Sequence, residues 1–188
     1  TVSFVSGHDC QGRVEYGATA ALGQVADEGA ARQLHHIELA TLQPATSYHY
    51  RVSCGSVGPS KSHRFETTAS APAGVKLVAL SDSQDSGESG RWGDVAQEIS
   101  ASHGDADLLV FAGDLAFNDA PGLWWTFFDR ARELLASTVI LVAPGNHDTP
   151  GVTSSADTTS IERYFPGGGA THYSLQVGSA LLLALDSE

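Results

Sequence analysis

The stretch Gly145-Asn146-His147-Asp148 decides the fold of this chain, because it marks where a buried strand stops and polar side chains begin. It follows the apolar run 138–143 (TVILVA), which is typical of a buried strand, and Pro144 and Gly145 end that strand. In open α/β sheets, ligands bind at the carboxyl ends of the strands. We therefore interpret this stretch as an amide, an imidazole and a carboxylate presented together at a binding edge.

Two upstream runs have the same form. The run 75–80 (VKLVAL) leads into Asp82 and Gln84, and the run 107–112 (DLLVFA) leads into Gly113-Asp114. Helical stripes lie between the three runs, so strands alternate with helices and a largely parallel sheet is predicted. The stripes comprise Trp92, Val95, Ala96 and Ile99, then Trp124, Phe128, Ala131 and Leu135. Residues 149–160 are predicted to form a surface loop, and 173–177 and 180–185 two further strands.

The composition restricts the function. The 188 residues carry 22 acidic and 10 basic side chains, a formal net charge of −12. Nucleic acids and anionic membranes need clustered Lys and Arg, so we expect neither as a partner. No apolar run approaches the roughly 18 residues that indicate a membrane span.

Residues 1–68 contain alternating runs at 1–5, 13–17, 34–39 and 48–52 without intervening helices, which predicts a β-sandwich. Residues 69–74 (ASAPAG) have the composition of a linker, and residues 75–188 form the α/β part. His35 and His36 are adjacent on a predicted strand and point to opposite faces, which makes them poor joint ligands. We expect both to lie on the surface.

The segment Leu42–Tyr48 (LQPATSY) resembles the corner before strand F of a fibronectin type III domain, in which a Tyr hydroxyl bonds to upstream backbone. A simple proline turn before a strand is the alternative. In the register of that domain, Cys10 falls in the B–C connection and Cys54 at the end of strand F, at the same end of the sandwich. A disulfide and an oxidising compartment are therefore expected, and a free buried pair stays open.

The strand ends suit metal ions. Neighbouring strands lie roughly 4.8 Å apart, and the ions of a two-metal site lie about 3.5–4 Å apart. Asp114 is expected to bridge two ions, Asp82 to hold one, and the amide oxygen of Asn146 to hold the other. His147 would then lie near the reacting oxygens, with Asp148 fixing its tautomer.

These motifs resemble those of the calcineurin-like metallophosphoesterase superfamily, and of its purple acid phosphatase branch in particular. The resemblance rests on Asp82, Gly113-Asp114, Gly145-Asn146-His147-Asp148, the preceding fibronectin-like part, Tyr173-Ser174 and Leu185-Asp186-Ser187-Glu188. It implies hydrolysis of small-molecule phosphate esters by two metal ions of the Fe, Zn or Mn type, and an extracytoplasmic location. The implied fold is a fibronectin type III-like β-sandwich followed by a truncated α/β metallophosphoesterase-like domain.

Three features depart from that family. Gln84 stands where the first motif commonly has His, and its amide oxygen is a weaker ligand. Phe117 stands where the purple branch has a metal-binding Tyr. The later His ligands of the family have no match, so they would lie beyond Glu188. We therefore expect part of an enzyme; a non-catalytic binding or adhesive protein with a degenerate domain is the alternative.

Overall fold

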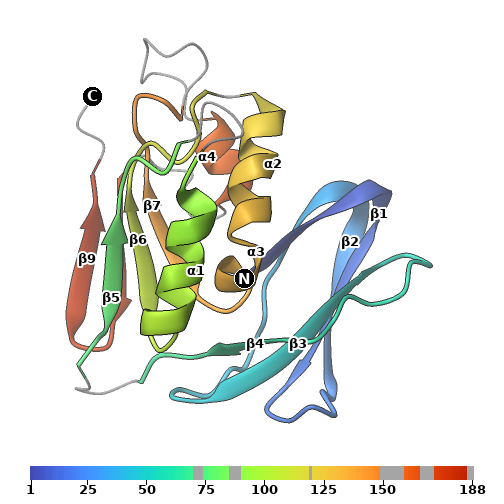
Figure 1. Ribbon diagram of the computed structural model, residues 1–188. Helices are drawn as coiled ribbons and strands as arrows, with labels where there is room; N and C mark the ends of the chain where they lie inside the picture. Colours follow the sequence, from blue (N-terminus) through green and yellow to red (C-terminus); the bar gives the residue numbers. More distant parts are fainter. Residues whose placement is uncertain (70–73, 85–89, 119, 149–158, 166–171, 186–188) are drawn as a thin grey trace. The chain divides into compact units, whose positions relative to one another are not determined.

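The computed structural model describes residues 1–69, 74–84, 90–118, 120–148, 159–165 and 172–185. The chain divides into two compact units, Thr1–Ser70 and Ala71–Glu188. Figure 1 labels most elements of the two units, and each unit is described here by itself. Most of the predicted linker, most of the loop 149–160 and the final residues 186–188 lie outside the described residues.

The first unit is built from antiparallel strands. Its sheet has the order β2-β1-β3-β4, with β1 at Val2–Gly17, β2 at Gln24–Ile37, β3 at Ser47–Cys54 and β4 at His63–Glu66. The predicted strands 1–5 and 13–17 are thus one strand. Its pairing with β2 shifts register between Val5 and Cys10, and again between Gln11 and Arg13. Such irregularities bend a strand, so a single long strand passes through sequence that does not alternate throughout.

One face of this sheet carries the core of the unit. The buried cluster comprises Val14, Tyr16, Ile37, Leu39, Tyr48 and Tyr50. The described residues of the unit form this one sheet, where the prediction had two sheets facing each other. The fibronectin type III-like sandwich therefore stays a prediction, within a unit that is rich in β-structure.

The predicted corner and the predicted disulfide are both present. The hydroxyl of Tyr48 accepts a hydrogen bond of 2.9 Å from the backbone N–H of Gln43. Cys10 and Cys54 form a disulfide with their Cα atoms 5.6 Å apart. Cys10 lies within β1 and not in a connection between strands, because β1 continues through residues 6–12. The disulfide thus ties the bent part of β1 to the end of β3.

Cross-strand ion pairs cover part of the same sheet. Arg13 and Asp27 approach to 2.6 Å, and so do Arg51 and Glu15. Hydrogen bonding to Arg13 holds the pKa of Asp27 below its ordinary value, and hydrogen bonding to Arg51 does the same for Glu15. Because these pairs are solvent-exposed to a large extent, their contribution to stability is small.

The second unit contains the predicted parallel sheet, of order β5-β6-β7. Its strands are β5 (Leu77–Leu80), β6 (Leu108–Ala112) and β7 (Val139–Ala143), and both neighbouring pairs are parallel. Its helices are α1 (Trp92–His103), α2 (Pro121–Arg130), α3 (Arg132–Leu135) and α4 (Thr159–Tyr164). Pro121 opens α2, where its fixed φ suits a first helical position.

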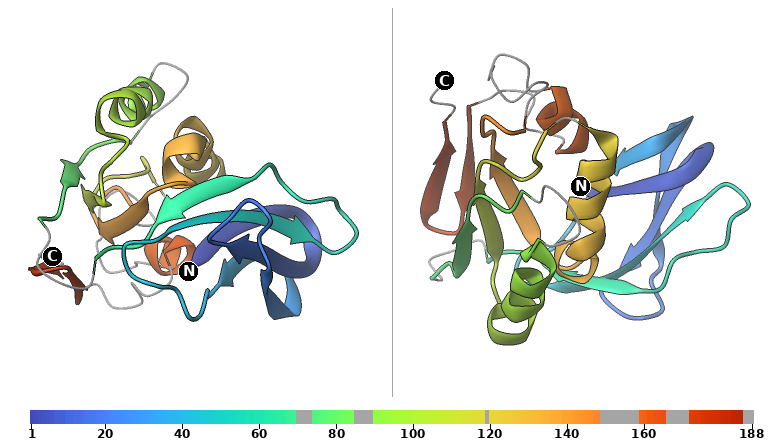
Figure 2. Two further views of the ribbon diagram at one scale, coloured as in Figure 1. Left: turned by 90° about the horizontal axis from the view of Figure 1, so that it is seen from below. Right: turned by 45° about the horizontal axis from the view of Figure 1, so that its top comes forward.

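Both faces of this sheet are covered, as is typical of parallel strands. On one face, the ring of Phe111 packs against Trp92 of α1 and Phe127 of α2, with centroids 5.4 and 5.7 Å apart. Figure 2 shows α1 and α2 on the same side of the strands. On the other face, Leu108 and Leu141 pack against Val177 of a hairpin. This hairpin consists of β8 (Tyr173–Val177) and β9 (Ala180–Ala184), where two strands were predicted.

Tyr173 joins this hairpin to the sheet. Its hydroxyl accepts a hydrogen bond of 3.0 Å from the N–H of Val142 and donates one of 2.6 Å to the carbonyl of the same residue. One side chain thus satisfies both backbone groups of a residue in β7, as a neighbouring strand would.

Three details differ from the predicted helices. Val95 is 40% exposed, while Trp92, Ala96 and Ile99 are buried. In the second stripe, Phe127 and Leu134 are buried in place of Phe128 and Leu135, because the helix is interrupted at Ala131. The short helix α4 was not predicted.

Among the described residues, no helix is both long and apolar enough to span a membrane.

Candidate metal centre at the strand ends

Three loops meet at the carboxyl ends of β5, β6 and β7, the edge at which the sequence places a site (Figure 1). The loop after β5 is bonded to the loop after β6 through backbone groups. The N–H of Asp82 donates to the carbonyl of Gly113 at 3.3 Å, and the N–H of Gln84 donates to the carbonyl of Asp114 at 3.0 Å. The first two motifs are therefore held side by side by the main chain itself.

Two glycines allow the loops after β6 and β7 to approach each other. A Cβ on Gly113, which has φ +88°, would lie 2.8 Å from the Cα of Gly145. A Cβ on Gly145 would collide with the backbone nitrogen and a carboxylate oxygen of Asp114. Backbone passes so close to backbone here that a side chain on either residue has no room. This close approach explains why each motif carries glycine immediately before its polar residue.

Asp82 and Asp114 both have left-handed backbone conformations, with φ of 54° and 59°. L-residues avoid this region, although Asp tolerates it better than most. Strained residues of this kind persist where the surrounding structure dictates them, and they cluster at functional sites. Both predicted carboxylate ligands share this conformation, which Leu22, Thr41 and Ala45 of the first unit also adopt.

The carboxylate of Asp114 lies at the centre of the loops. Its Oδ1 accepts a hydrogen bond of 3.0 Å from the N–H of His147, and its Oδ2 lies 3.3 Å from the amide nitrogen of Gln84. The other amide atom of Gln84, Oε1, is buried and has no hydrogen-bond partner within the described part of the chain. A buried acceptor without a donor is costly, unless a cation binds it.

Asp148 lies completely buried beneath these loops. One of its oxygens accepts hydrogen bonds from the N–H groups of Leu115 and Ala116, at 2.8 and 2.9 Å. The other accepts from the N–H groups of Asp114 and Gly145, at 2.9 and 3.0 Å. A single carboxylate therefore fixes the backbone of two loops.

Burial raises the pKa of Asp148 to about 6. Hydrogen bonds from the backbone of Ala116, Gly145 and Leu115 act in the opposite direction, and the neighbouring charge of Asp114 adds to the increase. The desolvation of the carboxylate thus outweighs the donors that face it.

The structure gives His147 different supporting contacts from those expected. Both oxygens of Asp148 are engaged by backbone N–H groups, so the role of orienting the imidazole falls elsewhere. The Nδ1 atom of His147 lies 3.2 Å from the carbonyl oxygen of Phe117, and the rings of the two residues pack with centroids 5.0 Å apart. Since a carbonyl can only accept, Nδ1 carries the hydrogen, and Nε2 is directed away from this contact.

The sequence-predicted ligands are thus placed on three joined loops, with Asp114 half-buried and Asp82 and Asn146 exposed. Phe117 was noted only as a residue that cannot bind metal, and its contact with His147 was missed. No sequence pattern marks a carbonyl oxygen, although the spacing of Phe117 from Asp114 brings it to the same loop.

A second group of ligand-type side chains was also missed, in the first unit. The ligand atoms of Cys10, His35 and Cys54 lie within 4.8 Å of one another. His35 is fully buried, contrary to the surface position predicted for it. The signal for burial was present, because His35 precedes the buried Ile37 by two residues and alternate residues of a strand share a face.

Comparison with known proteins points to one family. Over 118 residues, or 62% of the chain, the sequence is 32% identical to purple acid phosphatase 22 of Arabidopsis thaliana, and it is 31% identical to purple acid phosphatase 21 over 117 residues. These matches span only 25% and 24% of the relatives' lengths. No family profile matches the chain.

A solved structure agrees in fold. Purple acid phosphatase PPD1 from seeds of yellow lupin (Lupinus luteus) superimposes with a TM-score of 0.78 over 98% of this chain and 42% of that protein, at 17% sequence identity. At this identity the likeness concerns the fold alone. The resemblance that the strand-end motifs predicted is confirmed: the chain is similar to purple acid phosphatases in sequence and in fold.

Proposed function

We propose that this chain is part of a metal-dependent enzyme that hydrolyses phosphate esters of small molecules at a two-metal centre. The observation that carries the proposal is the junction of three strand-end loops around the Asp114 carboxylate, with Asp82 and Asp114 both held in a strained conformation. The names of the similar proteins, which are phosphatases, support the same reaction class.

The side chains at these loops fit the ions that the proposal needs. Asp82, Asp114, Asn146 and Gln84 offer carboxylate and amide oxygens, which suit hard cations, and the buried Oε1 of Gln84 has no donor in the described structure. Bound ions of the Fe, Zn or Mn type would supply Lewis-acid stabilisation of phosphoryl charge and a water molecule activated for attack. The strongly acidic chain gains from binding cations and disfavours nucleic acid as a substrate.

Each remaining residue has a role that follows from its contacts. Asp114 is suited to lie between two ions, since its loop is bonded to both neighbouring loops. His147 holds its Nδ1 hydrogen on the carbonyl of Phe117, so Nε2 is the nitrogen that would carry the second proton of the imidazolium form and donate it to the departing alcohol. Asp148 positions the loops through backbone N–H groups and does not itself face the substrate in this proposal.

A non-catalytic binding or adhesive protein is the second candidate. Phe117 offers no side-chain oxygen to a metal, and Gln84 replaces an imidazole with a weaker ligand. Both features reduce the affinity expected for metal ions, and they favour a domain that keeps the fold without turnover. The disulfide agrees with an extracytoplasmic location under either reading.

Hydrolysis of para-nitrophenyl phosphate and of its bis ester separates the two candidates. The natural protein that contains this chain would be loaded in turn with Mn²⁺, Zn²⁺ and iron, and assayed against a metal-free control. We expect metal-dependent turnover that His147→Ala lowers by about 10²–10⁴-fold with its metal content unchanged. The exposed His103, replaced in the same way, provides the matched control. A metal-loaded protein without turnover would support the binding protein and contradict the enzyme.

A further inference from the structure

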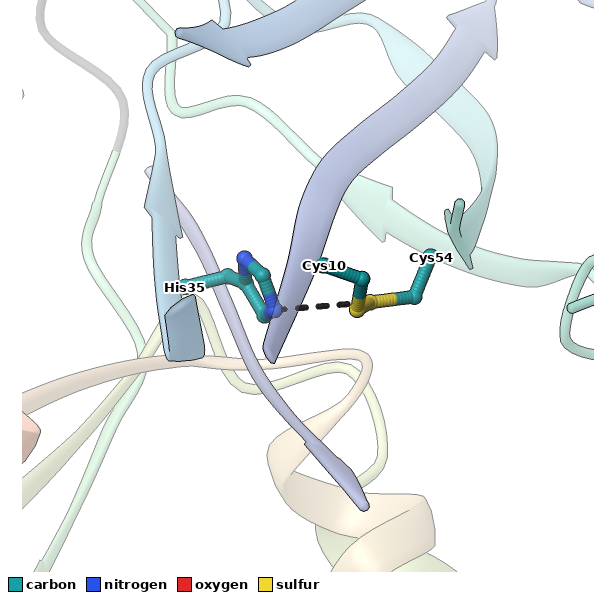
Figure 3. A group of neighbouring side chains, drawn as sticks. All are labelled: Cys10, His35 and Cys54. Carbon is teal, nitrogen blue, oxygen red and sulfur yellow. Dashed lines mark hydrogen bonds between the residues drawn. A yellow bond between two sulfur atoms is a disulfide. The ribbon is translucent and has the colours of Figure 1, made fainter. Parts of the chain in front are cut away.

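Two cysteines and a histidine converge inside the first unit, within the sequence of the fibronectin-like part. Cys10 comes from β1, His35 from β2 and Cys54 from β3, and all three are buried. Figure 3 shows the imidazole directed at the disulfide, with its Nε2 atom 3.7 Å from the sulfur of Cys54. Nothing in the proposed phosphatase reaction uses this group.

The orientation of His35 is fixed on every side. Its Nδ1 atom lies 2.6 Å from a carboxylate oxygen of Glu28, and its ring stacks on Phe4 with centroids 4.4 Å apart. A Cβ on Gly12 would lie 2.5 Å from Nδ1, so the chain keeps a glycine where the ring needs the space. The Nε2 atom, which also lies 3.0 Å from the hydroxyl of Ser6, therefore stays directed at the sulfur atoms.

We propose that reduction of the Cys10–Cys54 disulfide opens a binding site for a thiophilic divalent cation of the zinc class, with both thiolates and Nε2 of His35 as ligands. Zn²⁺ takes sulfur at about 2.3 Å and imidazole nitrogen at about 2.0 Å, so its ligand atoms lie less than about 4 Å apart. The distance of 3.7 Å from Nε2 to the sulfur of Cys54 already meets that requirement.

Glu28 supplies the second part of the site. A histidine that binds metal through one nitrogen typically donates the other N–H to a carboxylate, which fixes the tautomer and strengthens the ligand. Glu28 occupies that position on His35, and it is also paired with Arg32 at 3.1 Å. Three protein ligands leave one position of a tetrahedral ion, which water can occupy on the half-buried side of Ser6.

The conversion balances with a dithiol as the reductant. The dithiol forms its own disulfide and delivers two electrons and two protons, the S–S bond between Cys10 and Cys54 breaks, and two thiols result. Binding of the cation then releases both thiol protons, so affinity rises with pH. In the oxidised state a covalent bond ties β1 to β3, and in the reduced state the cation would tie β1, β2 and β3 together.

Titration of the full chain with Co²⁺ tests this proposal. One sample is first reduced with dithiothreitol, which is then removed under anaerobic conditions, and the other sample is left oxidised. The reduced chain should bind one Co²⁺ with a thiolate-to-metal charge-transfer absorption, and the oxidised chain should show no such band. Glu28→Gln should weaken binding by about 10–100-fold, and His35→Gln by at least as much. The half-buried neighbour His36, changed to Gln, should have no effect.

Two further measurements keep the test decisive. Asp114→Asn should leave the charge-transfer band unchanged, because the strand-end centre offers oxygen ligands and no thiolate. If reduction unfolds the first unit, Co²⁺ should restore its circular dichroism spectrum. A reduced chain that shows no thiolate band and no recovery, or a band of equal affinity in His35→Gln, would overturn the proposal.

Discussion

His35 in the first unit and Asp148 in the second are both fully buried polar side chains, but their partners differ in kind. His35 contacts the side chains of Glu28, Ser6 and Cys54. Asp148 accepts hydrogen bonds from the backbone N–H groups of four residues. Side-chain partners can gain or lose a proton, or be oxidised or reduced, while the backbone stays in place. Backbone partners cannot be lost without changing the shape of the loops, so Asp148 determines the geometry of the loops that contact it.

The largest effect should come from removing the carboxylate of Asp148. Asp148→Ala leaves four backbone donors without their acceptor, and each unsatisfied buried donor costs about 1–3 kcal/mol. We expect the second unit to lose at least about 4 kcal/mol of unfolding free energy, or to fail to fold. Urea denaturation followed by tryptophan fluorescence measures this unit alone, since every tryptophan of the chain lies within Ala71–Glu188. The exposed Asp94, changed to Ala, should shift the midpoint only slightly.

Removal of the disulfide should affect the first unit and leave the second unchanged. Cys10 and Cys54 are 44 residues apart, and a crosslink over such a loop contributes about 3–4 kcal/mol in the chain-entropy description. In a Cys10→Ser/Cys54→Ser variant, hydrogen exchange in β1 and β3 should accelerate accordingly. The midpoint of urea unfolding of the second unit, followed by tryptophan fluorescence, should not change. A shift in that transition would contradict the prediction that the disulfide stabilises the first unit alone.

When metal is removed with a chelator, the stability of the second unit should fall as pH rises, and the stability of the first unit should fall as pH decreases. The raised pKa of Asp148 means that its protonated form is favoured by folding, so its stabilising contribution is present at low pH and is lost as pH rises through about 6. The loss for the second unit is on the order of 3 kcal/mol between about pH 4 and pH 7. Urea denaturation followed by tryptophan fluorescence should show this loss of unfolding free energy. The Asp148→Asn variant should not show the loss.

In the first unit, the lowered pKa values of Glu15 and Asp27 give the reverse sign. Their stabilising contribution is present above the unfolded pKa and is lost as pH falls through the lower folded pKa. The protection factors of the β1 amides, which compare each exchange rate with its intrinsic rate at the same pH, should therefore fall on acidification. A loss of stability in the first unit as pH rises to neutrality would contradict this assignment.

Crowding His35 should have a smaller effect than removing the disulfide. A methyl group on Gly12 would lie 2.5 Å from Nδ1, so Gly12→Ala forces the ring or the strand to move. Overpacking of this kind costs about 1–3 kcal/mol. Gly7→Ala is the matched control, because no atom lies within 4 Å of a Cβ at that position. Thermal melts should show a lower transition temperature for Gly12→Ala than for Gly7→Ala.

Much of this arrangement could be predicted from local sequence. The three parallel strands and the polar residues that follow them were predicted, because short apolar runs ending in Gly or Pro carry both signals at once. The bond from Gln43 to Tyr48 was predicted as well, since its partners lie only five residues apart.

The contacts that cross between distant segments could not be predicted. The donors to Asp148 on the loop after β6 lie 32–34 residues away, and they are backbone groups that no residue type identifies. The continuity of β1 was missed, because its register irregularities interrupt the alternation on which strand prediction depends. The contacts of His35 with Phe4 and with the sulfur of Cys54 could not be predicted either, because only the folded sheet brings these residues together.

Above all, we propose that the loops held by Asp148 form part of a metal centre around Asp114. Isothermal titration of the oxidised full chain with Mn²⁺ tests it most directly, because the disulfide then keeps both thiols from acting as ligands. We predict Mn²⁺ binding that Asp114→Asn weakens at least about tenfold and Asp94→Asn leaves unchanged. Mn²⁺ at 100 times its dissociation constant should raise the stability of the second unit by about 2.7 kcal/mol. Equal Mn²⁺ affinity in the chain and in its Asp114→Asn variant would contradict the claim.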